Sequence, residues 1–217
     1  VEDLNRGVPP LFEPGLEELV VRAIKAGNLT YTIDVQAALR DTPYVLLTYD
    51  TPVDNHDRVN LSGILAAISD LAPYLEPGSI IVVASQVPVG TCSEMKSSVQ
   101  KGRPELEFDV AYTPENLRLG QAILAFRNPD FLVIGADSQT TQDRVEALFE
   151  PLKAPVVKMD LRSAEMTKHA LNTFLGLCIS YINEVANLCD EVGADAVQVA
   201  NALKLDKRVG ARVPLSP

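Results

Sequence analysis

Short apolar runs alternate with longer amphipathic stretches over the first 160 residues of the chain. Strands are expected at Tyr44–Tyr49, Ile80–Ala84, Phe108–Tyr112, Phe131–Gly135 and Val156–Met159. The first two of these runs are almost continuously apolar, as in strands buried on both faces of a parallel sheet. Helices are expected at Leu16–Ala26, before the first strand, and between later strands at Leu61–Leu75, Ser93–Gln100 and Thr140–Leu152. This alternation predicts an α/β fold with a parallel sheet.

The pattern changes after Asp160. A continuous helical pattern runs over Ser163–Val192 and predicts a helix about 45 Å long. Asp160 or Ser163 can cap its start, and Gly193 stands where a left-handed residue ends many helices. Asp195 is typical of the N-cap of a further helix, Ala196–Leu205. We therefore expect two domains, residues 1–160 and 161–217.

Composition and charge exclude several classes of protein. The formal net charge is -10, from 29 acidic and 19 basic residues, which disfavours nucleic acid as a partner. No apolar run approaches the roughly 18–20 residues of a membrane span, and the first residues lack a signal-peptide profile. We therefore expect a cytoplasmic protein. Three cysteines without a Cys-x-x-Cys pair, and two distant histidines, predict neither disulfides nor a metal site.

Three predicted strands end in turns that contain proline. The turns read Asp50-Thr51-Pro52, Ser85-Gln86-Val87-Pro88 and Thr113-Pro114-Glu115-Asn116-Leu117. The carboxyl ends of parallel strands lie at one edge of a sheet, so these turns should converge there, where open α/β sheets bind ligands. Proline stiffens each turn and holds the neighbouring hydroxyl or carboxylate groups in place. Either these turns only end the strands, or they line a ligand site.

The glycines show what the chain lacks. A dinucleotide-binding sheet needs a Gly-x-Gly-x-x-Gly turn after its first strand, so that the pyrophosphate can approach bare backbone. No two of the 12 glycines lie closer than Gly7 and Gly15. Either the sheet binds something else, or its first β-α-β unit lies outside these residues. Residues 1–10, interpreted as a segment that leaves a strand and enters a loop, favour the second explanation.

Lys168 and Asn172 lie four residues apart in the long predicted helix. They therefore share one face, a single turn from each other. A cation and an amide held side by side on a rigid helix suit a developing oxyanion, through charge and hydrogen bonding. The alternative is a solvated polar stripe on a surface helix.

Short motifs span nearly the whole chain in a fixed order. They are Phe12-Glu13-Pro14-Gly15-Leu16, Thr51-Pro52, Ser85-Gln86-Val87-Pro88-Val89-Gly90-Thr91, Pro114-Glu115-Asn116-Leu117, Asn128-Pro129-Asp130, Ser163-Ala164-Glu165-Met166 with Lys168 and Asn172, Ile182-Asn183-Glu184, and Asp206-Lys207-Arg208-Val209-Gly210. Together these motifs resemble those of the UDP-glucose/GDP-mannose dehydrogenase family.

The resemblance implies a Rossmann-like parallel sheet without its first β-α-β unit, followed by the long central helix of an all-α dimerisation domain. It implies an NAD-dependent enzyme that oxidises the C6 alcohol of a UDP-sugar to the uronate through a cysteine thioester. Thr51, Pro52, Ser85 and Gln86 would line the NAD site. Glu115, Asn116, Leu117, Lys168 and Asn172 would contact the UDP-sugar, with Glu115, Lys168 and Asn172 as the catalytic group. The helix over residues 163–192 would form a homodimer.

Three departures from the family pattern stand out. Gln86 replaces a threonine that helps to handle the catalytic water, and Leu119 replaces a second carboxylate. The family's nucleophilic cysteine lies beyond Asp206–Gly210, and none of this chain's cysteines, Cys92, Cys178 and Cys189, matches it. We therefore expect these 217 residues alone to be inactive.

Two other interpretations stay open. The departures would also suit a non-catalytic dimerisation or binding module derived from the same family. The wider group of hydroxy-acid dehydrogenases also joins a Rossmann domain to a long helix with a lysine and an asparagine four apart. The Val-Pro-Val-Gly and Pro-Glu-Asn-Leu turns argue against that second interpretation.

Overall fold

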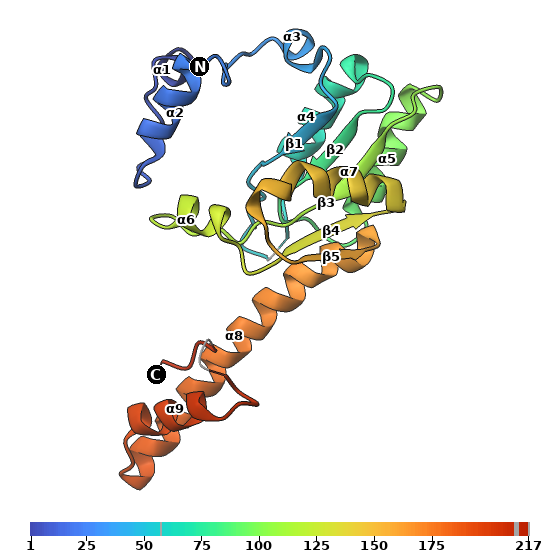
Figure 1. Ribbon diagram of the computed structural model, residues 1–217. Coiled ribbons are helices and arrows are strands. Elements are labelled where there is room, and N and C mark those ends of the chain that lie inside the picture. Colours follow the sequence, from blue (N-terminus) through green and yellow to red (C-terminus); the bar gives the residue numbers. More distant parts are fainter. Residues whose placement is uncertain (57, 211–212, 217) are drawn as a thin grey trace. The chain divides into compact units, whose positions relative to one another are not determined.

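The computed structural model describes residues 1–56, 58–210 and 213–216. The chain divides into two compact units, Val1–Glu165 and Met166–Pro217. The strands are β1 Tyr44–Leu47, β2 Ile80–Val83, β3 Asp109–Tyr112, β4 Leu132–Ala136 and β5 Val156–Met159 (Figure 1). The helices of the first unit are α1 Glu2–Asn5, α2 Leu16–Lys25, α3 Val35–Leu39, α4 Ser62–Leu71, α5 Thr91–Gly102, α6 Ala122–Arg127 and α7 Gln139–Phe149, with short 3-10 turns η1 Ala72–Tyr74 and η2 Glu150–Leu152.

The five predicted strands form one sheet in chain order, which confirms the expected α/β fold. Strands β1, β2 and β3 pair in parallel, and β4 pairs in parallel with β5. The expectation of a wholly parallel sheet is wrong at one place, because β4 runs antiparallel to β3. A parallel connection must carry the chain back along the strand. The connection between β3 and β4 holds only the short helix α6, about 9 Å long, and no helix that matches the roughly 17 Å length of a five-residue strand.

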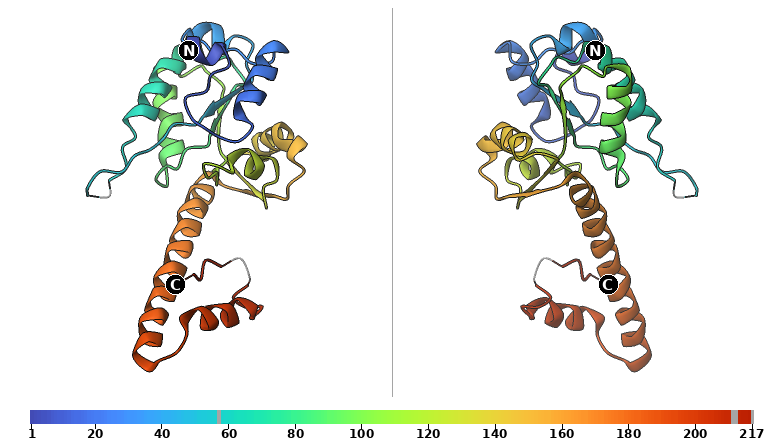
Figure 2. Two further views of the ribbon diagram at one scale, coloured as in Figure 1. Left: turned by 90° about the vertical axis from the view of Figure 1, so that its left-hand side faces the viewer. Right: turned by 90° about the vertical axis from the view of Figure 1, so that its right-hand side faces the viewer.

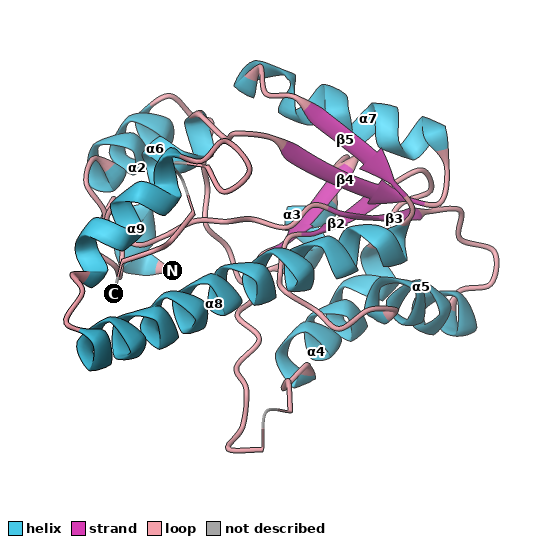
Figure 3. Cartoon of the chain, turned by 90° about the horizontal axis from the view of Figure 1, so that it is seen from below, coloured by secondary structure: helices cyan, strands magenta, loops and turns pink. Residues whose placement is uncertain are grey.

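Helices cover both faces of the sheet (Figure 3). The alternation of side chains along β2 shows the two layers, because successive residues of a strand point to opposite faces. Ile81 and Val83 belong to the core that includes residues of α4 and α5. Ile80 and Val82 belong to the smaller core that includes Val145 of α7. All four residues of β2 are fully buried, as the apolar run predicted.

Most helix predictions are confirmed within a few residues, and the differences have local causes. Two predicted helices change into 3-10 turns near their ends, at Pro73 in η1 and at Pro151 in η2. Proline lacks the N–H that would continue the α-helical ladder. The pattern did not predict α1, α3 or α6, each of six residues or fewer. The interpretation of residues 1–10 as strand end and loop is wrong at α1.

Helix α8, Leu161–Val192, is continuous, and α9, Ala196–Leu205, follows it (Figure 2). Asp160 caps the start of α8, because its carboxylate accepts a 2.9 Å hydrogen bond from the backbone N–H of Ser163. Gly193 follows the helix with a φ of 71°. Asp195 caps α9 through the N–H groups of the second and third residues after it, at 2.8 and 3.1 Å. In the second unit, Ile182 of α8 and Ala200 of α9 share a small apolar core.

Asp109 joins helices on the two faces of the sheet, and it provides a test of acid stability. Its carboxylate lies 3.1 Å from the ammonium of Lys96 in α5 and accepts a 2.7 Å hydrogen bond from the hydroxyl of Thr141 in α7. Burial raises the pKa of this carboxyl, but the hydrogen bonds from Thr141 and Lys96 outweigh burial and hold the pKa below its usual range. The stabilisation is therefore full above the ordinary aspartate pKa of about 3.9 and is lost as the pH falls through the folded-state pKa.

We expect Asp109→Asn to lower the free energy of unfolding at neutral pH by about 0.5–1 kcal/mol, a small value because the side chain is partly exposed. Denaturant unfolding at a series of pH values would show the difference from wild type shrinking below about pH 4. Asp70→Asn, at an exposed position in α4, is the matched control. An equal loss for both variants at every pH would contradict the prediction.

Candidate functional site

The proline-containing turns meet at the carboxyl edge of the parallel strands. The hydroxyl of Thr51, after β1, donates a 2.6 Å hydrogen bond to the carbonyl oxygen of Gln86, after β2. The N–H of Thr113, after β3, donates a 2.9 Å hydrogen bond to the carbonyl oxygen of Val83 in β2. Strand pairing and these bonds confirm the prediction that the three turns share one edge.

Three of the predicted site residues in the first two turns, Thr51, Ser85 and Gln86, have polar but uncharged side chains. Ser85 is buried, and its hydroxyl lies 3.4 Å from the carbonyl oxygen of Leu47. Thr51 is half-buried and Gln86 is exposed. Hydroxyl and amide groups of this kind suit hydrogen bonds to the neutral parts of a ligand, such as sugar hydroxyls or a carboxamide, better than they suit a phosphate.

Helix α5 begins directly after the turn of β2, and a carboxylate from a distant part of the chain occupies its N-terminus. Glu165 in α8 is fully buried. Its carboxylate accepts hydrogen bonds from the N–H of Gly90, at 2.5 Å, and of Cys92, at 2.8 Å. Gly90 has a φ of 100°, which glycine adopts without a Cβ clash. The helix dipole favours an anion here, and the protein supplies it from Glu165.

Cys92 and Tyr112 lie beside this carboxylate and are fully buried. Burial, and then the charge of Glu165, raise the pKa of the Cys92 thiol well above its ordinary value. Burial also raises the pKa of the Tyr112 phenol, with further contributions from Cys92 and Glu165. Because a thiolate is the reactive form of cysteine, Cys92 lacks the character of a nucleophile.

A second buried carboxylate holds the loop that follows β3. Glu13 accepts hydrogen bonds from the N–H of Gly120, at 2.6 Å, and of Ala122, at 2.8 Å. Gly120 has a φ of 87°, and α6 begins at Ala122. Within the loop, the carboxylate of Glu115 accepts a hydrogen bond from the N–H of Leu117. Glu115, Asn116 and Leu117 are all exposed at this edge of the first unit.

Sequence reasoning did not single out Glu13 or Glu165 as site residues. For Glu165 a signal existed, because it lies four residues after the buried Leu161 and directly after the buried Ala164, on the apolar side of α8. For Glu13 the proline and glycine that follow it indicated only a turn.

Lys168 and Asn172 belong to the second unit. They lie four residues apart on α8, where Lys168 is half-buried and Asn172 is exposed. Their shared face is therefore confirmed by the continuous helix. Their approach to the turns of the first unit stays a prediction.

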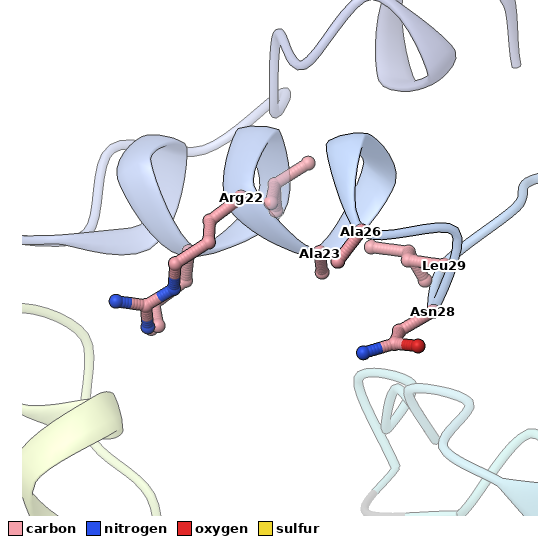
Figure 4. Close-up of a pocket in the computed structure, with 7 residues that line it drawn as sticks. Arg22, Ala23, Ala26, Asn28 and Leu29 are labelled. Atoms are coloured by element: carbon pink, nitrogen blue, oxygen red, sulfur yellow. The ribbon is translucent and has the colours of Figure 1, made fainter.

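An open hollow of about 490 Å³ runs along α2 (Figure 4). Its lining is mostly apolar and includes Ala23, Ala26 and Leu29, with Arg22 and Asn28 at its polar positions. None of the predicted site residues lines it, so it has no part in the candidate site.

Two domains of one family match the chain in succession. The NAD binding domain of the UDP-glucose/GDP-mannose dehydrogenase family matches residues 1–153, and its central domain matches residues 162–217. The chain belongs to this family.

Individual members of the family match along almost the whole chain. UDP-glucose 6-dehydrogenase TuaD of Bacillus subtilis (strain 168) is 39% identical over 211 residues, which are 97% of this chain and 46% of the relative. A solved UDP-glucose dehydrogenase from Pyrobaculum islandicum is 33% identical with a TM-score of 0.90, and the match covers 98% of this chain and 50% of that one. A solved GDP-mannose dehydrogenase from Pseudomonas aeruginosa is 26% identical with a TM-score of 0.90. That match covers 100% of this chain and 52% of the solved one. The chain thus spans about half the length of these relatives.

Membership of the dehydrogenase family confirms the resemblance seen in the motifs, the Rossmann-like sheet and NAD as the cofactor. Within residues 1–56, 58–210 and 213–216, no helix is both long and apolar enough to cross a bilayer. The same residues hold no group of three or more His, Cys, Asp or Glu side chains that could bind a metal.

Proposed function

We propose that the complete protein oxidises the C6 primary alcohol of a UDP-sugar to a carboxylate. The observation that carries this proposal is the 39% identity to a UDP-glucose 6-dehydrogenase over 97% of the chain. In the overall reaction the CH₂OH group and one water become a carboxylate, two NAD⁺ become two NADH, and three protons are released. A cytoplasmic location is part of the same proposal.

Bound NAD supplies the hydride acceptor for both oxidation steps. In the proposed site Thr51, Pro52, Ser85 and Gln86 hold it, and their uncharged groups fit its ribose and carboxamide parts. The pyrophosphate needs a different partner. The N-terminus of α5 already holds Glu165, and the 217 residues contain no Gly-x-Gly-x-x-Gly turn.

The loop after β3 is the proposed contact for the sugar nucleotide, through Glu115, Asn116 and Leu117. On α8, the proposed roles of the Lys168 ammonium and the Asn172 amide are to stabilise negative charge on the oxygen at C6. An ammonium is suited to this role because charge develops on that oxygen when the hydroxyl loses its proton.

Helix α8 also supports a homodimer. Phe174, Leu177, Tyr181 and Leu188 are each more than half exposed, and their spacing forms an apolar stripe on one face of the helix. A second copy of the same helix would bury such a stripe, as in coiled-coil packing.

We expect Leu177→Glu to shift the complete protein from dimer to monomer, because it places a charge in the middle of this stripe. Light scattering over a range of concentrations would measure the mass. Lys204→Glu on α9, which also introduces a glutamate, is the control and should leave the mass unchanged. A wild-type protein that is monomeric at all concentrations would contradict the dimer.

The proposed reaction is tested by titrating the complete protein with UDP-glucose, UDP-N-acetylmannosamine and GDP-mannose while NADH formation is followed. Two NADH per UDP-sugar is the expected result, and the isolated 217 residues should give none. Gln86 and Leu119 favour a second candidate, a non-catalytic binding module. In that case the complete protein would bind a UDP-sugar without reducing NAD.

A further inference from the structure

Glu13 and Glu165 hold two different turns of the first unit in the same way. Each carboxylate accepts hydrogen bonds from two N–H groups that lie two residues apart. In each pair the first N–H belongs to a glycine with positive φ, Gly90 or Gly120. Because both carboxylate oxygens are used, the contact determines the orientation of the turn as well as its distance from the carboxylate.

Neither contact is an ordinary helix cap. A local cap uses the side chain of the residue at the helix start, and neither α5 nor α6 has a side-chain cap of this kind. The two carboxylates come from positions 75 and 107 residues away in the sequence. A remote carboxylate stabilises the helix start and also fastens it to another element, the first turns of α8 for Glu165 and the segment before α2 for Glu13.

Both carboxylates are buried, so the fold depends on the hydrogen bonds that they accept. Glu165 is fully buried and Glu13 is 8% exposed. Burying an ionised carboxylate is costly unless hydrogen bonds replace its lost water. Two backbone donors for each carboxylate provide this replacement, and they also satisfy N–H groups that the helix itself leaves unbonded.

We propose that Glu13 and Glu165 are positioning residues with separate duties. Glu165 holds the cofactor turn, residues 85–90, and Glu13 holds the substrate loop, residues 114–121. The proposal rests on the proposed function for the ligand that each segment receives. Neither residue touches a ligand; each acts through the backbone that it orients.

The variants Glu13→Gln and Glu165→Gln separate these duties. Glutamine keeps the shape and one acceptor oxygen, but its NH₂ group faces the second backbone N–H and leaves that donor unbonded. In the complete protein we expect Glu165→Gln to raise the KM for NAD by roughly tenfold, the factor that corresponds to 1.4 kcal/mol, and to leave the KM for UDP-glucose within about twofold. Glu13→Gln should raise the KM for UDP-glucose by roughly tenfold and leave the KM for NAD within about twofold.

Each variant is the control for the other, and Glu107→Gln, at an exposed position before β3, is a further control. A purely structural role would lower the thermal midpoint and the active fraction without any selectivity between the two KM values. Equal changes in both KM values, or none, would overturn the proposal. If a glutamine variant does not fold, the aspartate variant, which keeps the charge but shortens the reach, must show the same selectivity.

Amide hydrogen exchange tests the positioning without relying on activity. Glu165→Gln should speed exchange at Gly90 and Cys92 only, and Glu13→Gln at Gly120 and Ala122 only. Uniform or unchanged exchange would overturn the proposal. If the exchange pattern holds and wild-type protein reduces no NAD with any UDP-sugar, the positioning role stands and the proposed function fails.

Discussion

Lys168→Ala is expected to reduce kcat of the complete protein by about 10²–10³-fold, the typical cost of removing one donor that stabilises an oxyanion. The lysine lies on a continuous helix one turn before Asn172, so its ammonium is carried by a rigid element. Charge develops on the C6 oxygen only as the reaction proceeds. The loss should therefore appear in kcat, with the KM for NAD almost unchanged.

Steady-state kinetics with UDP-glucose and NAD would measure this effect. Lys101→Ala, at an exposed position near the end of α5, is the matched control and should keep wild-type kcat. A Lys168→Ala enzyme with wild-type kcat would remove the oxyanion role. It would leave Lys168 as part of a solvated polar stripe on α8.

Gly135→Ala is expected to give the largest loss of stability for a small change, about 1–3 kcal/mol in the free energy of unfolding. A Cβ at Gly135 in β4 would come within 2.4 Å of the Cβ of Ala164 and 3.2 Å of the carbonyl oxygen of Asp160. Ala164 lies in the first turn of α8 and Asp160 directly precedes this helix, so the obstacles are a buried methyl group and a backbone carbonyl. Neither can move aside as the end of a long side chain could.

Thermal or denaturant unfolding would measure the loss. Gly102→Ala, with open space around its Cβ position in the last turn of α5, is the control, and it should leave stability equal or slightly higher. Equal stability of wild type and Gly135→Ala would mean that β4 and the start of α8 can separate at little cost.

Features encoded by neighbouring residues could be predicted from the sequence. The apolar runs located all five strands, and the caps Asp160 and Asp195 and the terminal Gly193 located the ends of α8 and the start of α9. The order of short motifs identified the family. The three turns could be placed at one edge because parallel strands put their carboxyl ends together.

Features that depend on contacts between distant residues could not be predicted from the sequence and are visible only in the tertiary structure. The direction of β4 relative to β3 is seen only in the strand pairing, because no periodicity in the sequence encodes it. Glu13 reaches a partner 107 residues away, and Glu165 reaches one 75 residues away. The sequence shows that a charged residue lies among apolar ones, but it does not show which backbone groups that residue will contact. The reason is physical: local propensity is set by adjacent side chains, whereas a buried carboxylate is stable only where the fold delivers backbone N–H groups to it.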